Sequence, residues 1–200
     1  MTRRQTWHAV PASGPNPHEA LAASAWIERF APLVAAGARV LDVASGHGRH
    51  ARYFARRGAR VLAVDRDAQA LATLDGCNGI TTRVADLEAG PWPLAQEVFD
   101  AIVVVNYLHR ASFPHLLEAL APTGLLLYET FAAGNERFGR PTNPAFLLRM
   151  NELLELARGR LTIVAFEQGR VDDGRAAVVQ RLAAVGPAHP WPPPLPAGAA

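Results

Sequence analysis

Two glycines and two carboxylates stand at a spacing suited to binding an adenosine-containing molecule. Gly46 and Gly48 follow a buried-looking apolar stretch that contains Asp42, and Asp65 closes the next apolar stretch. Glycines in a turn permit close approach of a ligand to the backbone. A carboxylate at the end of the following strand can accept hydrogen bonds from both hydroxyls of a ribose. Gly46 and Gly48 alone are also consistent with a tight turn that binds nothing, and Asp65 favours the binding interpretation.

Asp42 bears on which adenosine-containing cofactor this turn would hold. Dinucleotide folds bring backbone N–H groups and a helix N-terminus to a pyrophosphate, which an acidic residue just before the turn would repel. A cationic aminoacyl tail suits such a residue better. An NAD-dependent oxidoreductase is therefore kept only as an alternative, and the sequence also lacks a convincing catalytic Tyr-Lys pair.

The elements that must position these residues alternate between strand-like apolar runs and segments of helical periodicity, which is typical of βαβ units. We expect a doubly wound, Rossmann-like α/β fold: a seven-stranded, mostly parallel sheet with helices on both faces. Right-handed crossover makes the first two strands neighbours. The expected strands are 39–43, 60–64, 82–85, 99–105, 124–131, 161–167 and 176–182, and the expected helices are 24–33, capped by Ser24, 48–57, 68–74 and 113–120.

The length and composition indicate one domain, because 200 residues with 50% hydrophobic composition suffice for a single substantial core. We expect an N-terminal arm over 1–20, the main domain over 21–186 and a proline-rich, extended tail over 187–200, for which an SH3-type ligand role is disfavoured. The single cysteine, Cys77, excludes an internal disulfide framework and cysteine-rich zinc sites, so we expect no metal and a cytoplasmic location. No apolar run approaches the roughly 20 residues of a membrane span.

All twenty basic residues are arginine, and this excludes mechanisms that require a lysine amine, such as a Walker phosphate loop or pyridoxal phosphate chemistry. The net charge of +2 makes only a weak field. The arginines at 49, 52, 56 and 57 alternate with apolar residues along one helix, so a solvated outer face is favoured over a nucleic-acid surface.

The stretch 40–50 closely resembles motif I of class I S-adenosylmethionine (SAM)-dependent methyltransferases: a strand, an acidic residue, three residues and Gly-x-Gly. The resemblance continues through most of the chain, in residues 63–65, 85–87, 92–94 with 99–103, and 120–124. Thr123 departs from the usual glycine of the last motif, and Ala44-Ser45 replaces a commoner pair in the first. Residues 48–51 with 57–58 look like the tellurite-resistance and small-molecule branch of this superfamily.

The resemblance implies a set of cofactor contacts for SAM and for its product, S-adenosylhomocysteine. Asp42 and the backbone of Gly46 and Gly48 would hold the methionine part, Asp65 the ribose, and Asp86 with Leu87 the adenine. Asp86 is also consistent with a helix cap or a turn, and Leu87 with ordinary core. Further cofactor contacts are expected at Ala44, Arg66 and Asn106.

Methyl transfer needs alignment and desolvation, and sometimes a base. The catalytic candidates are His109, which titrates near neutrality, and Tyr107, which is favoured as a wall or hydrogen-bond donor. Glu129 and Phe131, at the end of the strand 124–131, are candidate acceptor contacts. A packed strand end and a core ring are the alternatives for these two residues.

The segment 132–144 is longer than a usual connection and is a candidate substrate lid. In this hypothesis Arg137, Phe138 and Arg140 shape acceptor recognition. The alternative is a surface loop that ends in an Asn143 cap, with Pro144 in the first helical turn.

The sequence therefore predicts an enzyme that transfers a methyl group from SAM to a small-molecule acceptor, with a metalloid oxyanion among the acceptors considered. Methylation of RNA or protein, and SAM binding without catalysis, remain alternatives. A membrane partner is not expected and a nucleic-acid partner is disfavoured. The acceptor, the use of a base and the oligomeric state are left open.

Overall fold

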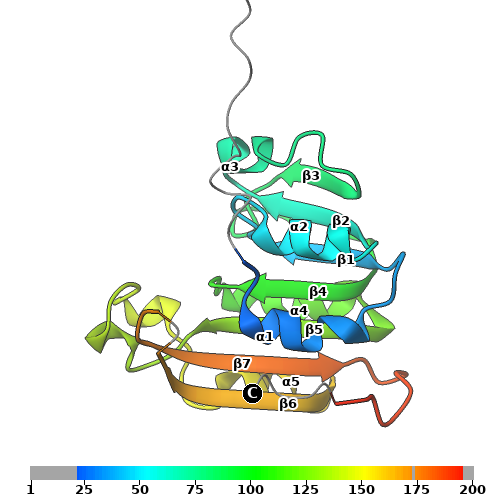
Figure 1. Cartoon of the computed structure of the whole chain (residues 1–200). Coiled ribbons are helices and arrows are strands. Elements are labelled where there is room, and N and C mark those ends of the chain that lie inside the picture. Colours follow the sequence, from blue (N-terminus) through cyan, green and yellow to red (C-terminus); the bar gives the residue numbers. More distant parts are fainter. Residues whose placement is uncertain (1–21, 173, 196–200) are drawn as a thin grey trace, which may run out of the picture.

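Seven strands form one mixed sheet in the computed structural model, which describes residues 22–172 and 174–195. The order across the sheet is β3-β2-β1-β4-β5-β7-β6, and only β7 runs antiparallel to its neighbours (Figure 1). This confirms the expected seven-stranded, mostly parallel sheet and adds an antiparallel hairpin at one edge. The strands are β1 (Arg39–Val43), β2 (Arg60–Asp65), β3 (Ile80–Val84), β4 (Phe99–Val105), β5 (Leu120–Phe131), β6 (Thr162–Val171) and β7 (Ala177–Val185).

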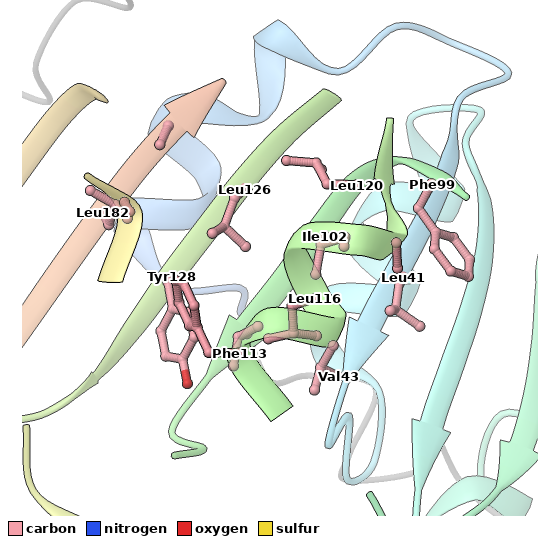
Figure 2. Close-up of a cluster of buried hydrophobic side chains, with 14 of the residues drawn as sticks. Leu41, Val43, Phe99, Ile102, Phe113, Leu116, Leu120, Leu126, Tyr128 and Leu182 are labelled. Atoms are coloured by element: carbon pink, nitrogen blue, oxygen red, sulfur yellow. The ribbon is translucent and has the colours of Figure 1, made fainter. Parts of the chain in front are cut away.

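Helices cover both faces of this sheet. On one face, α1 (Ala25–Phe30), α2 (Arg49–Arg56) and α3 (Ala68–Ala72) supply apolar side chains to one core cluster. On the other, α4 (Phe113–Ala119) and α5 (Glu152–Ala157) pack on a second cluster. Side chains of a strand alternate between faces, so Val40 joins the first cluster while Leu41 and Val43 join the second. Figure 2 shows Phe113 and Leu116 of α4 against the side chains of this second cluster.

Local capping sets where several helices begin. The Ser24 hydroxyl accepts the N–H of Trp26 at 3.2 Å, which confirms the predicted cap of α1. Asp67 caps α3 in the same way. The predicted Asn143 cap is also present, at the short 3-10 helix Pro144–Phe146. A further 3-10 helix, Ala31–Leu33, continues the helix predicted from Ser24.

Several boundaries differ from the prediction, among them the ends of β6 and β7, which lie at residues 171 and 185 rather than 167 and 182. β5 begins at Leu120 rather than at residue 124. The register against β4 shifts between Phe99 and Ala101, and this irregularity lets the residues Pro122–Gly124, which suggested a turn, lie within the strand. The helix α5 was not predicted at residues 152–157; the helix start considered at Pro144 is only the 3-10 helix Pro144–Phe146. Its buried Leu153 and Ala157 cover the sheet beside β7. This tertiary packing stabilises a helix that is too short to be predicted from its own sequence.

The two ends of the chain lie partly outside the described residues. The predicted arm over 1–20 is among those not described, as are residues 196–200 of the tail. Residues 187–195 of the tail contain no helix or strand, as the prolines predict. No helix in the described part of the chain combines the length and apolar character that a membrane span requires.

Candidate active site

The glycine turn after β1 is held in a left-handed conformation. Ala44, Gly46 and Gly48 have φ angles of 51°, 52° and 71°. A side chain at Gly48 would place its Cβ 2.5 Å from the Leu74 side chain, so this position requires glycine for space as well as for φ. At Gly46 the same Cβ would meet nothing within 4 Å, so the turn leaves open space there. The Gly46 N–H donates to Asp65 and the Gly48 N–H to the Ser45 carbonyl, so both groups are engaged within the protein.

Asp42 lies beneath this turn rather than in it. Its carboxylate is buried and accepts the N–H of Ala51, in the first turn of α2, at 2.9 Å. Burial raises the pKa of Asp42 to about 7. The residue thus ties β1 to the start of α2 and thereby sets the path of the turn. Its predicted contact with a cationic aminoacyl tail stays a prediction.

Arg52 is hydrogen-bonded to the same turn, and this corrects the expectation that it lies on a solvated face. The sequence placed the arginines of this helix on a solvated face, but Arg52 is buried and donates to the carbonyls of His47 and Thr73. Arg56 and Arg57 are exposed as expected. One arginine of the four therefore connects the glycine turn to the end of α3, because its guanidinium can donate to two carbonyl oxygens at once.

Asp65, at the end of β2, holds two loops with one carboxylate. One oxygen accepts the N–H of Gly46 at 2.8 Å and the other accepts the N–H of Asp67 at 2.9 Å. A carboxylate has about four lone-pair sites, so each oxygen retains capacity for one more donor. The group is therefore preorganised and can still accept two hydroxyl protons, as the ribose role requires.

A cavity of about 210 Å³ opens at the carboxyl ends of β1, β2 and β3. We call it the first cavity. Five of the predicted cofactor residues line it: Ala44, Asp65, Arg66, Asp86 and Leu87, together with Ala85, Glu88 and Tyr107. One Asp86 oxygen accepts the N–H of Glu88 at 2.9 Å, which is the turn role considered above, and its other oxygen is available to an adenine amine. Asp42, Gly46, Gly48 and Asn106 are not among the residues that line this cavity.

A second cavity, of about 260 Å³, adjoins the first and shares Glu88 and Tyr107 with it. It contains the predicted Asn106 and Phe131. Its other lining residues were not singled out from the sequence: Leu108, Thr130, Pro141 and Phe146, as well as the shared Glu88. Pro141 and Phe146 come from the segment between β5 and α5, which Figure 1 places at the carboxyl ends of the parallel strands.

Tyr107 stands at the junction of the two cavities. Burial, followed by the charge of Glu88, raises the pKa of Tyr107 to about 12. Its hydroxyl is buried and makes no hydrogen bond within 3.5 Å among the described residues, although Ser112 and Glu88 lie close by. A phenol with such a pKa stays protonated near neutrality. The structure thus favours a donor or wall over a base at this position.

His109 lies outside both cavities. Its Nδ1 is 2.6 Å from the Ser112 hydroxyl, which in turn donates to the Leu87 carbonyl at 3.0 Å. Since the hydroxyl has one proton, the histidine donates to it. The ring thereby fixes the turn after β4 against the segment that carries Leu87. Its predicted role as a base receives no support from this placement.

Glu129 and the charged loop are also separate from the cavities. Glu129 accepts the Ser24 hydroxyl at 2.8 Å and pairs with Arg181 at 3.0 Å, next to α1. The ring of Phe138 lies under the Arg170 guanidinium at 5.0 Å. Arg137 and Arg140 are exposed. None of these four residues lines the first or second cavity, and their predicted part in acceptor recognition stays a prediction.

Comparisons with known proteins agree with this geometry. A family model described as a methyltransferase domain matches residues 40–124, which hold the glycine turn, Asp65 and Asp86. A search of curated proteins finds no match.

Solved structures of methyltransferases share the fold. TehB from Haemophilus influenzae is 19% identical with a TM-score of 0.66; the match covers 80% of this chain and 61% of that chain, so this chain spans about three fifths of that protein. A TehB-like SAM-dependent methyltransferase from Corynebacterium glutamicum is 19% identical over 81% of this chain and 87% of that chain, with a TM-score of 0.61. The 1,6-didemethyltoxoflavin-N1-methyltransferase of Burkholderia thailandensis is 22% identical over 81% of this chain and 76% of that chain, with a TM-score of 0.60.

Residues 40–124 thus match a methyltransferase domain, and the chain shares its fold with solved SAM-dependent methyltransferases. The residues present fit SAM: Asp65 is placed to accept from a ribose, Asp86 and Leu87 to contact an adenine, and there is open space at Gly46. SAM supplies a methyl group on a positively charged sulfur, so the protein's own part is to bind, orient and exclude water.

Proposed function

We propose that the protein transfers the methyl group of SAM to a small molecule held in the second cavity. In this proposal the first cavity takes the adenosine part of the cofactor. The methionine part follows the open space beside Gly46, and Tyr107 lines both cavities beside the place where cofactor and acceptor would meet. The site lies at the end of the sheet where the parallel strands finish, which is where such folds bind ligands. A cytoplasmic location is part of the same proposal.

The observation that carries the proposal is that the two cavities meet. They share Glu88 and Tyr107, so molecules bound in both would lie against each other. Alignment of two bound reactants is the main requirement of a displacement on an activated methyl group. The second cavity measures about 260 Å³, a size that suits a small molecule better than a macromolecular segment. The Burkholderia neighbour, which binds 1,6-didemethyltoxoflavin, supports an acceptor of this kind.

Methylation of RNA or protein is the second candidate. No arginine is among the described residues that line the second cavity, whereas an RNA backbone would call for cations beside the acceptor position. This composition favours the small molecule. SAM binding without catalysis is the third candidate and is distinguished by turnover alone.

Calorimetric titration with SAM, S-adenosylhomocysteine and NAD tests the proposal before any acceptor is known. We expect micromolar binding of the two adenosyl ligands and none of NAD. A screen of small molecules for methyl transfer from SAM follows. Binding of NAD alone would overturn the cofactor assignment, and turnover on RNA but on no small molecule would favour the second candidate.

A further inference from the structure

The charge of the second cavity bears on what kind of acceptor it takes. Glu88 is the only ionised side chain among the described residues that line it, since Tyr107 stays protonated near neutrality. The remaining lining consists of the polar Asn106 and Thr130 and of apolar side chains, two of them phenylalanines. A ligand in this cavity therefore meets one negative charge, neutral hydrogen-bonding groups and aromatic walls.

Glu88 has no ion pair with an arginine or histidine within 4 Å in the described part of the chain. Its own N–H donates to Asp86, which fixes the backbone of the residue at the mouth of both cavities. Of the arginines near the second cavity in sequence, Arg110 pairs with Glu152, and Arg140, which precedes Pro141, is exposed and makes no ion pair within 4 Å in the described part of the chain. The charge of Glu88 is thus left for a ligand rather than balanced by the protein.

The Tyr107 hydroxyl, close to Glu88 and Ser112, is a second polar group that a ligand in this cavity would meet. It is a buried donor without a hydrogen bond within 3.5 Å in the described structure, on a residue that lines both cavities. Buried polar atoms without a partner are costly, and a ligand that accepts this proton would satisfy it. A molecule between Glu88 and Tyr107 is then recognised by one acceptor and one donor.

Resting on the function proposed above, we propose that Glu88 selects the acceptor: a planar amine or nitrogen heterocycle whose N–H group or positive charge faces this carboxylate. The two phenylalanine rings then bind the faces of the ring system, and the Tyr107 hydroxyl donates to a lone pair of the ligand. Anionic acceptors, the metalloid oxyanions included, are disfavoured by the like charge of Glu88 and by a described lining without arginine.

Three probes of matched shape test the proposal: benzylamine, which is cationic at pH 7, benzyl alcohol, which is neutral, and benzoate, which is anionic. Each is titrated into ¹⁵N-labelled protein saturated with S-adenosylhomocysteine, and amide shifts near Tyr107, Phe131 and Phe146 report binding. We expect benzylamine to bind at least about fivefold more tightly than benzoate, an effect reduced from that of a buried pair because Glu88 is exposed. Glu88→Gln should remove that preference, whereas the matched variant Glu155→Gln, on an exposed position of α5, should retain it.

The S-adenosylhomocysteine titration separates this proposal from the function on which it rests. Failure of the wild type to bind S-adenosylhomocysteine would count against the proposed function itself. Normal binding of S-adenosylhomocysteine together with tighter binding of benzoate, or with no binding of any probe, would overturn the role of Glu88 alone. A Glu88→Gln variant that weakens S-adenosylhomocysteine binding but keeps the preference for benzylamine would make Glu88 a cofactor residue instead.

Discussion

The Arg110 guanidinium donates two hydrogen bonds to the buried Glu152 carboxylate, from Nε at 2.6 Å and from a terminal nitrogen at 3.0 Å. The same guanidinium donates to the carbonyls of Ala145 and Leu147, at 2.7 and 2.9 Å. These carbonyls flank Phe146, a wall of the second cavity. One arginine after β4 thus joins the start of α5 to the segment that closes the proposed acceptor site.

Arg110→Met should destabilise the protein by about 2 kcal/mol, because it leaves the Glu152 carboxylate buried without its main partner. Breaking a fully buried pair costs about 3 to 5 kcal/mol, and the partial exposure of Arg110, 37% of its side chain, lowers the expected effect. Urea unfolding measures the change. Arg149→Met is the matched control, since Arg149 also contacts Glu152 but its side chain is 76% exposed. If both variants lost the same free energy of unfolding, Arg110 would not be the main partner of Glu152.

Asp65→Ala should weaken binding of S-adenosylhomocysteine by about 1.5 to 3 kcal/mol, or roughly tenfold to beyond a hundredfold. The reason is the loss of the acceptor for the ribose hydroxyls, together with release of the Gly46 N–H that Asp65 holds at 2.8 Å. Calorimetry gives the affinity. Asp75→Ala removes an exposed carboxylate outside both cavities and should bind normally. Unchanged affinity in the Asp65 variant would remove this residue from the ribose role.

Asp42 should make stability depend on pH. Its pKa is raised by burial from 3.8 to about 7, so the folded state prefers the protonated form. The stabilisation is complete below pH 3.8 and is lost as the pH rises through 7. Asp42→Asn lacks this titration, so the melting temperature of the wild type should fall relative to that of the variant between pH 5 and pH 8. His50, whose pKa is lowered to about 3 by burial, is common to both proteins and cancels in the difference. If the melting temperatures of the two proteins changed in parallel between pH 5 and pH 8, the raised pKa of Asp42 would be contradicted.

Gly48→Ala should destabilise the protein by about 2 to 4 kcal/mol. A left-handed conformation costs a residue with a Cβ about 1 to 2 kcal/mol, and forced packing in a core adds about 1 to 3 kcal/mol. The added Cβ would lie 2.5 Å from Leu74. Gly37→Ala is the control, because Gly37 has a φ of 80° with nothing within 4 Å and should show only the conformational cost. Similar unfolding energies for both variants would exclude a contribution from Leu74.

The sequence alone predicted where the residues at the ends of the first strands would lie. The parallel order of β1, β2 and β3 brings their carboxyl ends together, so Ala44, Asp65, Asp86 and Leu87, read as separate motifs along the chain, line one cavity. The hydrophobic pattern of each strand and the glycine turn are local signals, and local signals can be read without knowing the rest of the fold.

Only the tertiary structure decided which side chains from distant segments contact one another. Glu129 lies near the end of the predicted strand 124–131, yet in the sheet, where Glu129 pairs with Arg181 of β7, its carboxylate contacts Arg181 and Ser24. Arg52 appeared to be one of four surface arginines, and only the proximity of α3 buries it. Phe146 and Glu88 line the same cavity although they are far apart in the chain, and Arg110 holds the segment that carries Phe146 through the carbonyls of Ala145 and Leu147. Such contacts depend on side-chain packing between distant segments, which no local spacing encodes.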